Sequence, residues 1–139
     1  MTINADLTIF NLYIDSETKR EVMIPTEITG VSWYDTRSQP NGGNRPGSAS
    51  FVIRIPYTAE IQDGRTYVSE TDYAELADSE KSGYWTIQKG SYVVKGTGIE
   101  ATTFDQLREA EEDFVTVTEY ADNTVRGTDR IKHWRIGGM

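Results

Sequence analysis

The stretch Ser48-Ala49-Ser50-Phe51-Val52-Ile53-Arg54-Ile55-Pro56 has large apolar side chains at every second position from Phe51 to Ile55. In an extended segment Phe51, Ile53 and Ile55 point to one face, and Val52 and Arg54 point to the other. The proline at the end of the stretch has no backbone N–H and cannot continue a strand ladder. The stretch therefore predicts a β-strand with one buried face.

Short segments on both sides of this strand have the same period of two and are bounded by turn residues. They predict strands at residues 7–14, 22–24, 30–34, 84–88, 91–95, 114–120 and 131–136. The apolar phase shifts at the Ile9-Phe10 doublet, which predicts a β-bulge. The Lys89-Gly90 turn predicts that the fourth and fifth of these segments form a hairpin. The last two are expected to pair across a loop at 121–130.

Two segments depart from the strand pattern. The capping-box spacing of Ser69 to Asp72 predicts a short helix over residues 73–77, and residues 103–106 open a second one over 107–112. Both helices are short and polar, so neither suits the core of a doubly wound sheet.

Residues 36–48 form the third departure, because they are rich in Gly, Pro and Asn and contain no large apolar side chain. This composition predicts an extended, flexible loop. The sequence as a whole predicts one domain over residues 1–139. Its fold class is mainly β, a small antiparallel β-barrel or sandwich with one or two short helices and this long loop.

The composition limits the chemistry available to the chain. It has 14 Lys and Arg against 22 Asp and Glu, giving a formal charge of 14 − 22 = −8, with one His and no Cys. The absence of Cys excludes disulfides, thiolate metal sites and a thiol nucleophile. A charge of −8 opposes binding of a polyanion, since the cations are scattered along the chain. The chain is therefore expected to use no metal and no other cofactor.

The chain lacks two hydrophobic signals of membrane targeting. The N-terminal residues have no basic region followed by an apolar run, and no window approaches the roughly 20 apolar residues of a membrane helix. We expect a protein that is made in the cytoplasm and does not associate with membranes.

Three motifs admit both a functional and a structural interpretation. Residues 96–101 read G-x-G-x-x-A, as in a dinucleotide site, but the helix that follows is short and acidic, which favours a turn. His133 could act as a general base, although a hydrogen-bonded structural or interface role is the more frequent one. A set of aromatic residues could bind sugar rings, but their alternation favours core packing; they are Trp33, Trp85, Trp134, Tyr13, Tyr34 and Tyr92.

The sequence also resembles a family of proteins encoded among the head and tail genes of tailed phages and prophages of Gram-positive bacteria. The resemblance runs over nearly the whole chain, and its most distinctive parts are Lys89-Gly90 and the terminal His133-Trp-Arg-Ile-Gly-Gly138. The stretch from Ile87 to Val94 and the later strands are also similar to the β-barrel head-closure (stopper) proteins of siphophage necks. Gly90-Ser91 stands where phage joining proteins usually have Gly-Asp.

The resemblance implies a virion structural protein, not an enzyme, with no catalytic or cofactor-binding residues. It would be assembled in the host cytoplasm into a ring of six or twelve copies. Its partners would be a portal or adaptor protein and a tail-completion or tail-tube protein, with DNA passing through without tight binding. Tail-completion, tail-terminator and minor capsid roles remain open, as does a carbohydrate-binding module. The residues expected at the interaction surface are Arg37, Gln39, Pro40, Asn41, Gly42, Gly43, Asn44, Arg45, His133 and Trp134.

Overall fold

The computed structural model describes residues 2–35, 51–98, 105–107, 114–124, 127 and 132–139. The strands are β1 (Ala5–Ile14), β2 (Glu21–Asp35), β3 (Phe51–Pro56), β4 (Glu60–Ile61), β5 (Thr66–Tyr67), β6 (Tyr84–Trp85), β7 (Tyr92–Lys95), β8 (Phe114–Asn123) and β9 (His133–Gly138). The helical elements are η2 (Gln62–Gly64), α1 (Glu70–Glu75) and η3 (Asp78–Gly83). The predicted mainly β fold class is therefore confirmed.

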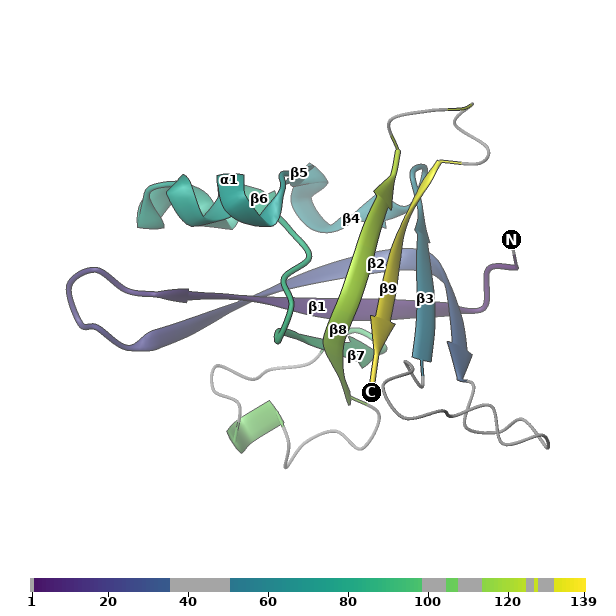
Figure 1. Cartoon of the computed structure of the whole chain (residues 1–139), viewed down its shortest axis with the longest axis horizontal. Coiled ribbons are helices and arrows are strands. Elements are labelled where there is room, and N and C mark those ends of the chain that lie inside the picture. The colour runs from purple at the N-terminus through teal and green to yellow at the C-terminus, as the bar shows by residue number, and fades with distance from the viewer. Residues whose placement is uncertain (1, 36–50, 99–104, 108–113, 125–126, 128–131) are drawn as a thin grey trace.

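Antiparallel pairing closes the main sheet into a barrel. Among the described residues the strands follow the order β1-β7-β8-β9-β3-β2, and β2 pairs again with β1. The long strand β2 makes this closure possible, because its residues 21–31 pair with β1 and its residues 32–35 pair with β3. Figure 1 shows that the far end of the β1–β2 hairpin extends beyond the barrel, beside α1.

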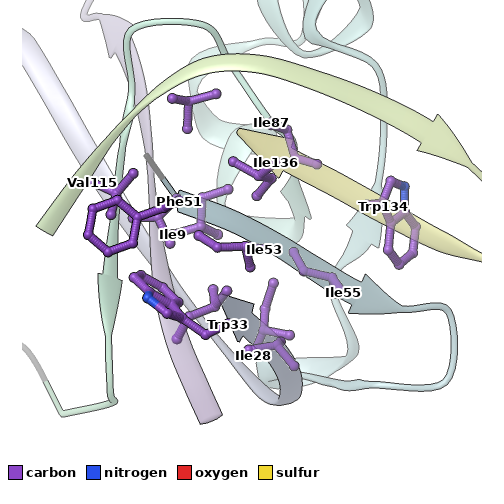
Figure 2. Close-up of a cluster of buried hydrophobic side chains, with 14 of the residues drawn as sticks. Ile9, Ile28, Trp33, Phe51, Ile53, Ile55, Ile87, Val115, Trp134 and Ile136 are labelled. Carbon is purple, nitrogen blue, oxygen red and sulfur yellow. The ribbon is translucent and has the colours of Figure 1, made fainter. Parts of the chain in front are cut away.

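The inward side chains of these strands make one apolar core. Phe51, Ile53 and Ile55 are buried while Arg54 is exposed, as the alternation of β3 predicts. Figure 2 shows this row meeting Ile136 and Trp134 of β9 inside the barrel. Burial of a large apolar side chain contributes about 1.5–3 kcal/mol, so this core supplies most of the favourable free energy of folding.

The predicted bulge at Ile9-Phe10 is wrong. The strand pairs with β2 without interruption from Asp6 to Ile14, and the register shifts instead between Ala5 and Asp6. Ile9 faces the barrel core, whereas Phe10 lies in a second buried cluster with Leu107 on the other face of the strand. The apolar doublet therefore reflects burial on both faces.

The predicted hairpin of residues 84–95 is also wrong. β6 pairs in parallel with β5, whereas β7 pairs with β1 and β8. Gly90 does adopt the left-handed conformation of a turn, with φ of 85°. The two strands separate because residues 86–88 run along β1, to which they are bound by side-chain amides.

Other predicted boundaries hold in part. Ser69 caps a helix as predicted, but α1 covers Glu70–Glu75 where residues 73–77 were expected. The start of the predicted loop at 121–130 belongs to β8, which continues to Asn123 opposite His133. Residues 105–107 are helical, while the rest of the second predicted helix and the 36–48 loop lie outside the described residues.

Candidate functional site

The predicted interaction residues divide into two groups. Eight of them, in the segment from Arg37 to Arg45, lie outside the described residues. His133 and Trp134 are consecutive on β9 and face opposite sides of the barrel wall. These two residues therefore have different environments and cannot act as one site.

Trp134 belongs to the core. It is 6% exposed, and its ring centroid lies 5.0 Å from that of Trp85 and 5.1 Å from that of Tyr67. Burial raises the pKa of Tyr67 to about 12. Trp33 is also buried. The three tryptophans thus pack inside the barrel and form no exposed platform for sugar rings.

His133 lies on the outer face of the barrel. Its Nε2 is 3.3 Å from Nδ2 of Asn123, the residue opposite it on β8. The next residue on the same face of β9 is Arg135, whose Nη1 lies 3.6 Å from Oε1 of Glu119. The environment of His133 is therefore a polar strand surface.

Close approach between strands explains the two glycines that end β9. A Cβ on Gly137 would lie 2.6 Å from Cγ of Glu119, because the glutamate side chain passes over this residue on its way to Arg135. A Cβ on Gly138 would meet Val115 and lie 2.5 Å from the carbonyl oxygen of Thr116. The Gly-Gly motif lets β8 and β9 close the barrel.

Side-chain amides attach residues 86–88 to the projecting half of the β1–β2 hairpin. Asn11 Nδ2 donates to the carbonyl oxygen of Thr86 over 2.6 Å, and the Thr86 N–H donates to Asn11 Oδ1. Leu12 and Gln88 are joined in the same reciprocal way, between the backbone of the first and the side-chain amide of the second. These pairs replace the strand–strand hydrogen bonds that β1 makes with β7 nearer the barrel.

A carboxylate ties the turn of the hairpin to the start of η3. The backbone N–H and the hydroxyl of Ser16 both donate to Oδ2 of Asp78, over 3.0 and 2.9 Å. These bonds stabilise the ionised carboxylate and lower the pKa of Asp78. The projecting hairpin is therefore held at its turn as well as along its edge.

A pocket of about 250 Å³ lies between this hairpin and the α1–η3 segment. Lys81 closes its floor: the side chain is nearly fully buried, and its ammonium lies 5.3 Å from the ring centroid of Tyr13 and 5.6 Å from that of Tyr73. The ammonium also donates to the carbonyl oxygen of Leu76 over 2.5 Å. The chain's own cation occupies the aromatic faces, so the pocket does not offer them to a cationic ligand.

Tyr73 forms the inner wall of the pocket. The residue is fully buried, and burial raises its pKa to about 12. Its hydroxyl has no hydrogen-bond partner within the described part of the chain. A neutral phenol with so high a pKa is a poor general base at neutral pH.

In the glycine motif predicted at residues 96–101, the described part, 96–98, lies in a different context from a dinucleotide site, and residues 99–101 lie outside the described residues. The Gly96 N–H donates to the carbonyl oxygen of Asp6, and the Gly98 N–H donates to a carboxylate oxygen of Glu27. The preceding strand β7 is antiparallel to both of its neighbours. These N–H groups are bound within the chain, where a dinucleotide site would offer them to phosphate.

Metal ligands are not clustered in the described ranges, where no group of three or more His, Cys, Asp or Glu could hold an ion. No helix among the same residues is long and apolar enough to cross a membrane.

The family was identified by comparison with family models. A model described as a family of unknown function (DUF6751) matches residues 1–139. The chain belongs to this family. No curated protein and no solved structure matches this DUF6751 member.

Two features of this DUF6751 chain were missed by sequence reasoning. Lys81 had no visible signal, because its burial depends on Tyr13, which is distant in the sequence. The second feature is the pair Arg54 and Arg135, which are direct neighbours on adjacent strands. The alternation of each strand already placed its arginine on the outward face. That the two arginines lie opposite each other follows only from the register of β3 and β9.

Proposed function

We propose that this chain is a structural subunit of a phage neck, which assembles into a head-closure or head–tail connector ring between the portal and the tail. It would act by packing against neighbours and not by catalysis, without a cofactor. It would be assembled in the host cytoplasm and become part of the virion. DNA would pass through the ring without tight binding.

The proposal rests on the β1–β2 hairpin, which projects beyond the barrel and is fixed in place by side-chain hydrogen bonds. A ring subunit needs an element that reaches beyond its own barrel to a neighbour, and it must be ordered beforehand to keep the entropic cost of assembly low. The hairpin extends past the barrel in Figure 1 and is fixed by Asn11, Gln88 and Asp78. Ile14 near its end is 59% exposed, as an interface residue of a free subunit would be.

Two further observations support a structural role. Within the described residues the barrel interior holds the packed side chains of its own core, as expected of a rigid structural body. The terminal Gly-Gly, part of the sequence that resembles the phage head and tail region family, coincides with the two residues that let β8 and β9 approach each other closely.

The proposal is tested by sedimentation velocity and negative-stain microscopy of the full chain over a range of concentrations. The chain has a mass of 15.7 kDa, and we expect closed rings of six or twelve copies, formed alone or on the portal or adaptor protein of the same phage. Association with the tail tube alone would favour the tail-completion or tail-terminator role. A monomer that ignores these partners and binds glycans would overturn the proposal.

A further inference from the structure

Two arginines lie directly opposite each other on the outer face of the barrel. Arg54 of β3 and Arg135 of β9 are register partners, and the flanking residues of β3 on the inner face, Ile53 and Ile55, are buried. Like charges directly opposite each other across an antiparallel pair destabilise the sheet. The chain carries this unfavourable pair although acids outnumber bases in it by 22 to 14.

Among the described residues, little neutralises the pair. Glu119 reaches Arg135, but the two atoms are 3.6 Å apart and both side chains are partly exposed. No carboxylate of the described residues lies within 4.0 Å of the Arg54 guanidinium. The β2–β3 connection, residues 36–50, contains two Arg and no Asp or Glu, so its sequence supplies no counter-charge.

The largest concentration of acid in the described structure lies elsewhere. Residues 69–83, which contain α1 and η3, carry five acids and one base, so their charge is 1 − 5 = −4, half of the total. The base is Lys81, which is buried, whereas Asp72, Glu75 and Glu80 are exposed. In Figure 1 this segment lies beside the hairpin to the left of the barrel, and β3 lies on the right.

We propose that the outer face around Arg54 and Arg135 binds the acidic segment, residues 69–83, of a second copy of this chain. This inference rests on the proposed function, of which it names the subunit contact. Arginine guanidinium groups bind carboxylates in a bidentate manner, and the exposed acids of the segment supply such groups. Because the two surfaces differ, the contact is head-to-tail, the type of interface that generates a ring when the rotation between copies closes.

Charge complementarity favours a second copy over DNA as the occupant. A protein that binds a duplex through its backbone makes about six to ten phosphate contacts, and the face offers two arginines on a chain of charge −8. An acidic segment of the same chain, by contrast, matches the face in sign and is present at the same concentration.

The test compares charge-reversal variants of the full chain by sedimentation velocity. Arg54→Glu with Arg135→Glu changes the charge from −8 to −12, and we expect at least a tenfold higher concentration for half-assembly. Lys89→Glu with Lys95→Glu makes the same change at two exposed lysines away from the face, and this control should assemble like the parent chain. Arg54→Glu alone disturbs no ion pair of the described residues and shows the effect without loss of the Glu119 contact.

A mixing experiment makes the test specific. Asp72→Lys, Glu75→Lys and Glu80→Lys in one chain should also prevent assembly. In an equimolar mixture with the double arginine variant, the arginine face of this chain meets the acidic segment of the other, and its lysine segment meets the glutamate face of the other. Opposite charges therefore meet at every contact, and the mixture should assemble into rings of alternating chains. Unfolding monitored by circular dichroism shows that each variant is folded.

The outcomes separate this inference from the proposed function. If the parent chain assembles and the double arginine variant assembles equally well, the inference is wrong while the ring proposal stands. If the control variant loses assembly to the same degree, net charge and not the face is responsible, and the inference is again wrong. Retention of duplex DNA by the parent chain that the arginine variant loses would assign the face to DNA. A parent chain that never assembles would overturn both proposals.

Discussion

The barrel and the projecting half of the β1–β2 hairpin are held together by different forces. In the barrel each strand pairs on both sides and the enclosed side chains are apolar, such as Ile53 and Ile136. In the hairpin β1 loses its neighbour β7 after Phe10, and polar groups of Asn11 and Gln88 replace the missing strand. A strand can thus leave a barrel without exposing an unpaired edge, provided that side-chain amides bind its backbone.

This difference predicts the largest loss of stability for a truncation in the barrel core. Trp85→Ala removes a buried ring that contacts Tyr67 and Trp134, and should lower the free energy of unfolding by about 3–5 kcal/mol. Urea denaturation followed by tryptophan fluorescence measures it. Trp134→Phe is the matched comparison: it keeps a ring and removes an indole N–H without a partner in the described residues, so it should cost less than half as much. Equal losses would contradict a core held by packing alone.

The second prediction concerns closure of the barrel. Gly138→Ala places a methyl group against Val115 and the carbonyl oxygen of Thr116, and should cost about 3 kcal/mol because the backbone of β8 cannot move without breaking its pairing with β9. Thermal unfolding measures the effect. Gly83→Ala is the control, since a Cβ there meets nothing within 4 Å. A tolerated Gly138→Ala would mean that β8 and β9 are farther apart than described.

The barrel was predictable from the sequence because its forces are local and periodic. The alternation of β3 identified its buried face before any partner was known. The cap of α1 was predictable for the same reason, since Ser69 and Asp72 are three residues apart and form their hydrogen bond locally. Each of these predictions depends on neighbours in the chain.

The pairing of residues 22–24 with the first strand across the turn at 15–21 was predicted from the sequence and is confirmed. The projection of this hairpin beyond the barrel and its attachments were not predictable, because they depend on contacts over long separations. Asn11 and Thr86 look like ordinary polar residues until they are brought together. The same limit explains why the hairpin predicted at 84–95 does not form. The alternation and the Gly90 turn are present, but residues 86–88, just before the turn, bind to β1. The arginine pair on β3 and β9 was likewise hidden until the register was known.

A third prediction tests whether the amide contacts hold the hairpin. Asn11→Ala leaves the buried N–H and carbonyl oxygen of Thr86 without their partner, which should cost about 2 kcal/mol. Hydrogen exchange should accelerate first at Leu12 and Thr86, while the amides of β9 stay protected until global unfolding. Asn123→Ala, at an exposed site on β8, should change stability by about 0.5 kcal/mol or less. Uniform acceleration over the whole chain would show that the hairpin and barrel open as one unit.

The smallest expected effect is at the turn of the hairpin, where the contact is exposed and ionic. Hydrogen bonds from Ser16 lower the pKa of Asp78, so the carboxylate stabilises the folded state above its unfolded pKa of about 3.9, and this contribution is lost as the pH falls through the lower folded pKa. Ser16→Ala removes the hydroxyl bond and keeps the N–H bond, which should raise the pKa of Asp78 part of the way back. Carboxyl-detected NMR titration measures it directly.

The matched variant for this titration is Thr18→Ala. Asp15 accepts from the backbone N–H groups of Thr18 and Glu17, which lower its pKa most, and a hydrogen bond from the Thr18 hydroxyl lowers it further. Loss of the Thr18 hydroxyl should raise the pKa of Asp15 and leave that of Asp78 unchanged. If Ser16→Ala moved neither carboxyl, the Ser16 hydroxyl would not bind Asp78 in solution, and the turn would depend on the remaining backbone N–H bond and on the amide contacts of the hairpin. Because a rigid hairpin is what the proposed ring requires, that result would also weaken the case for a preformed assembly element.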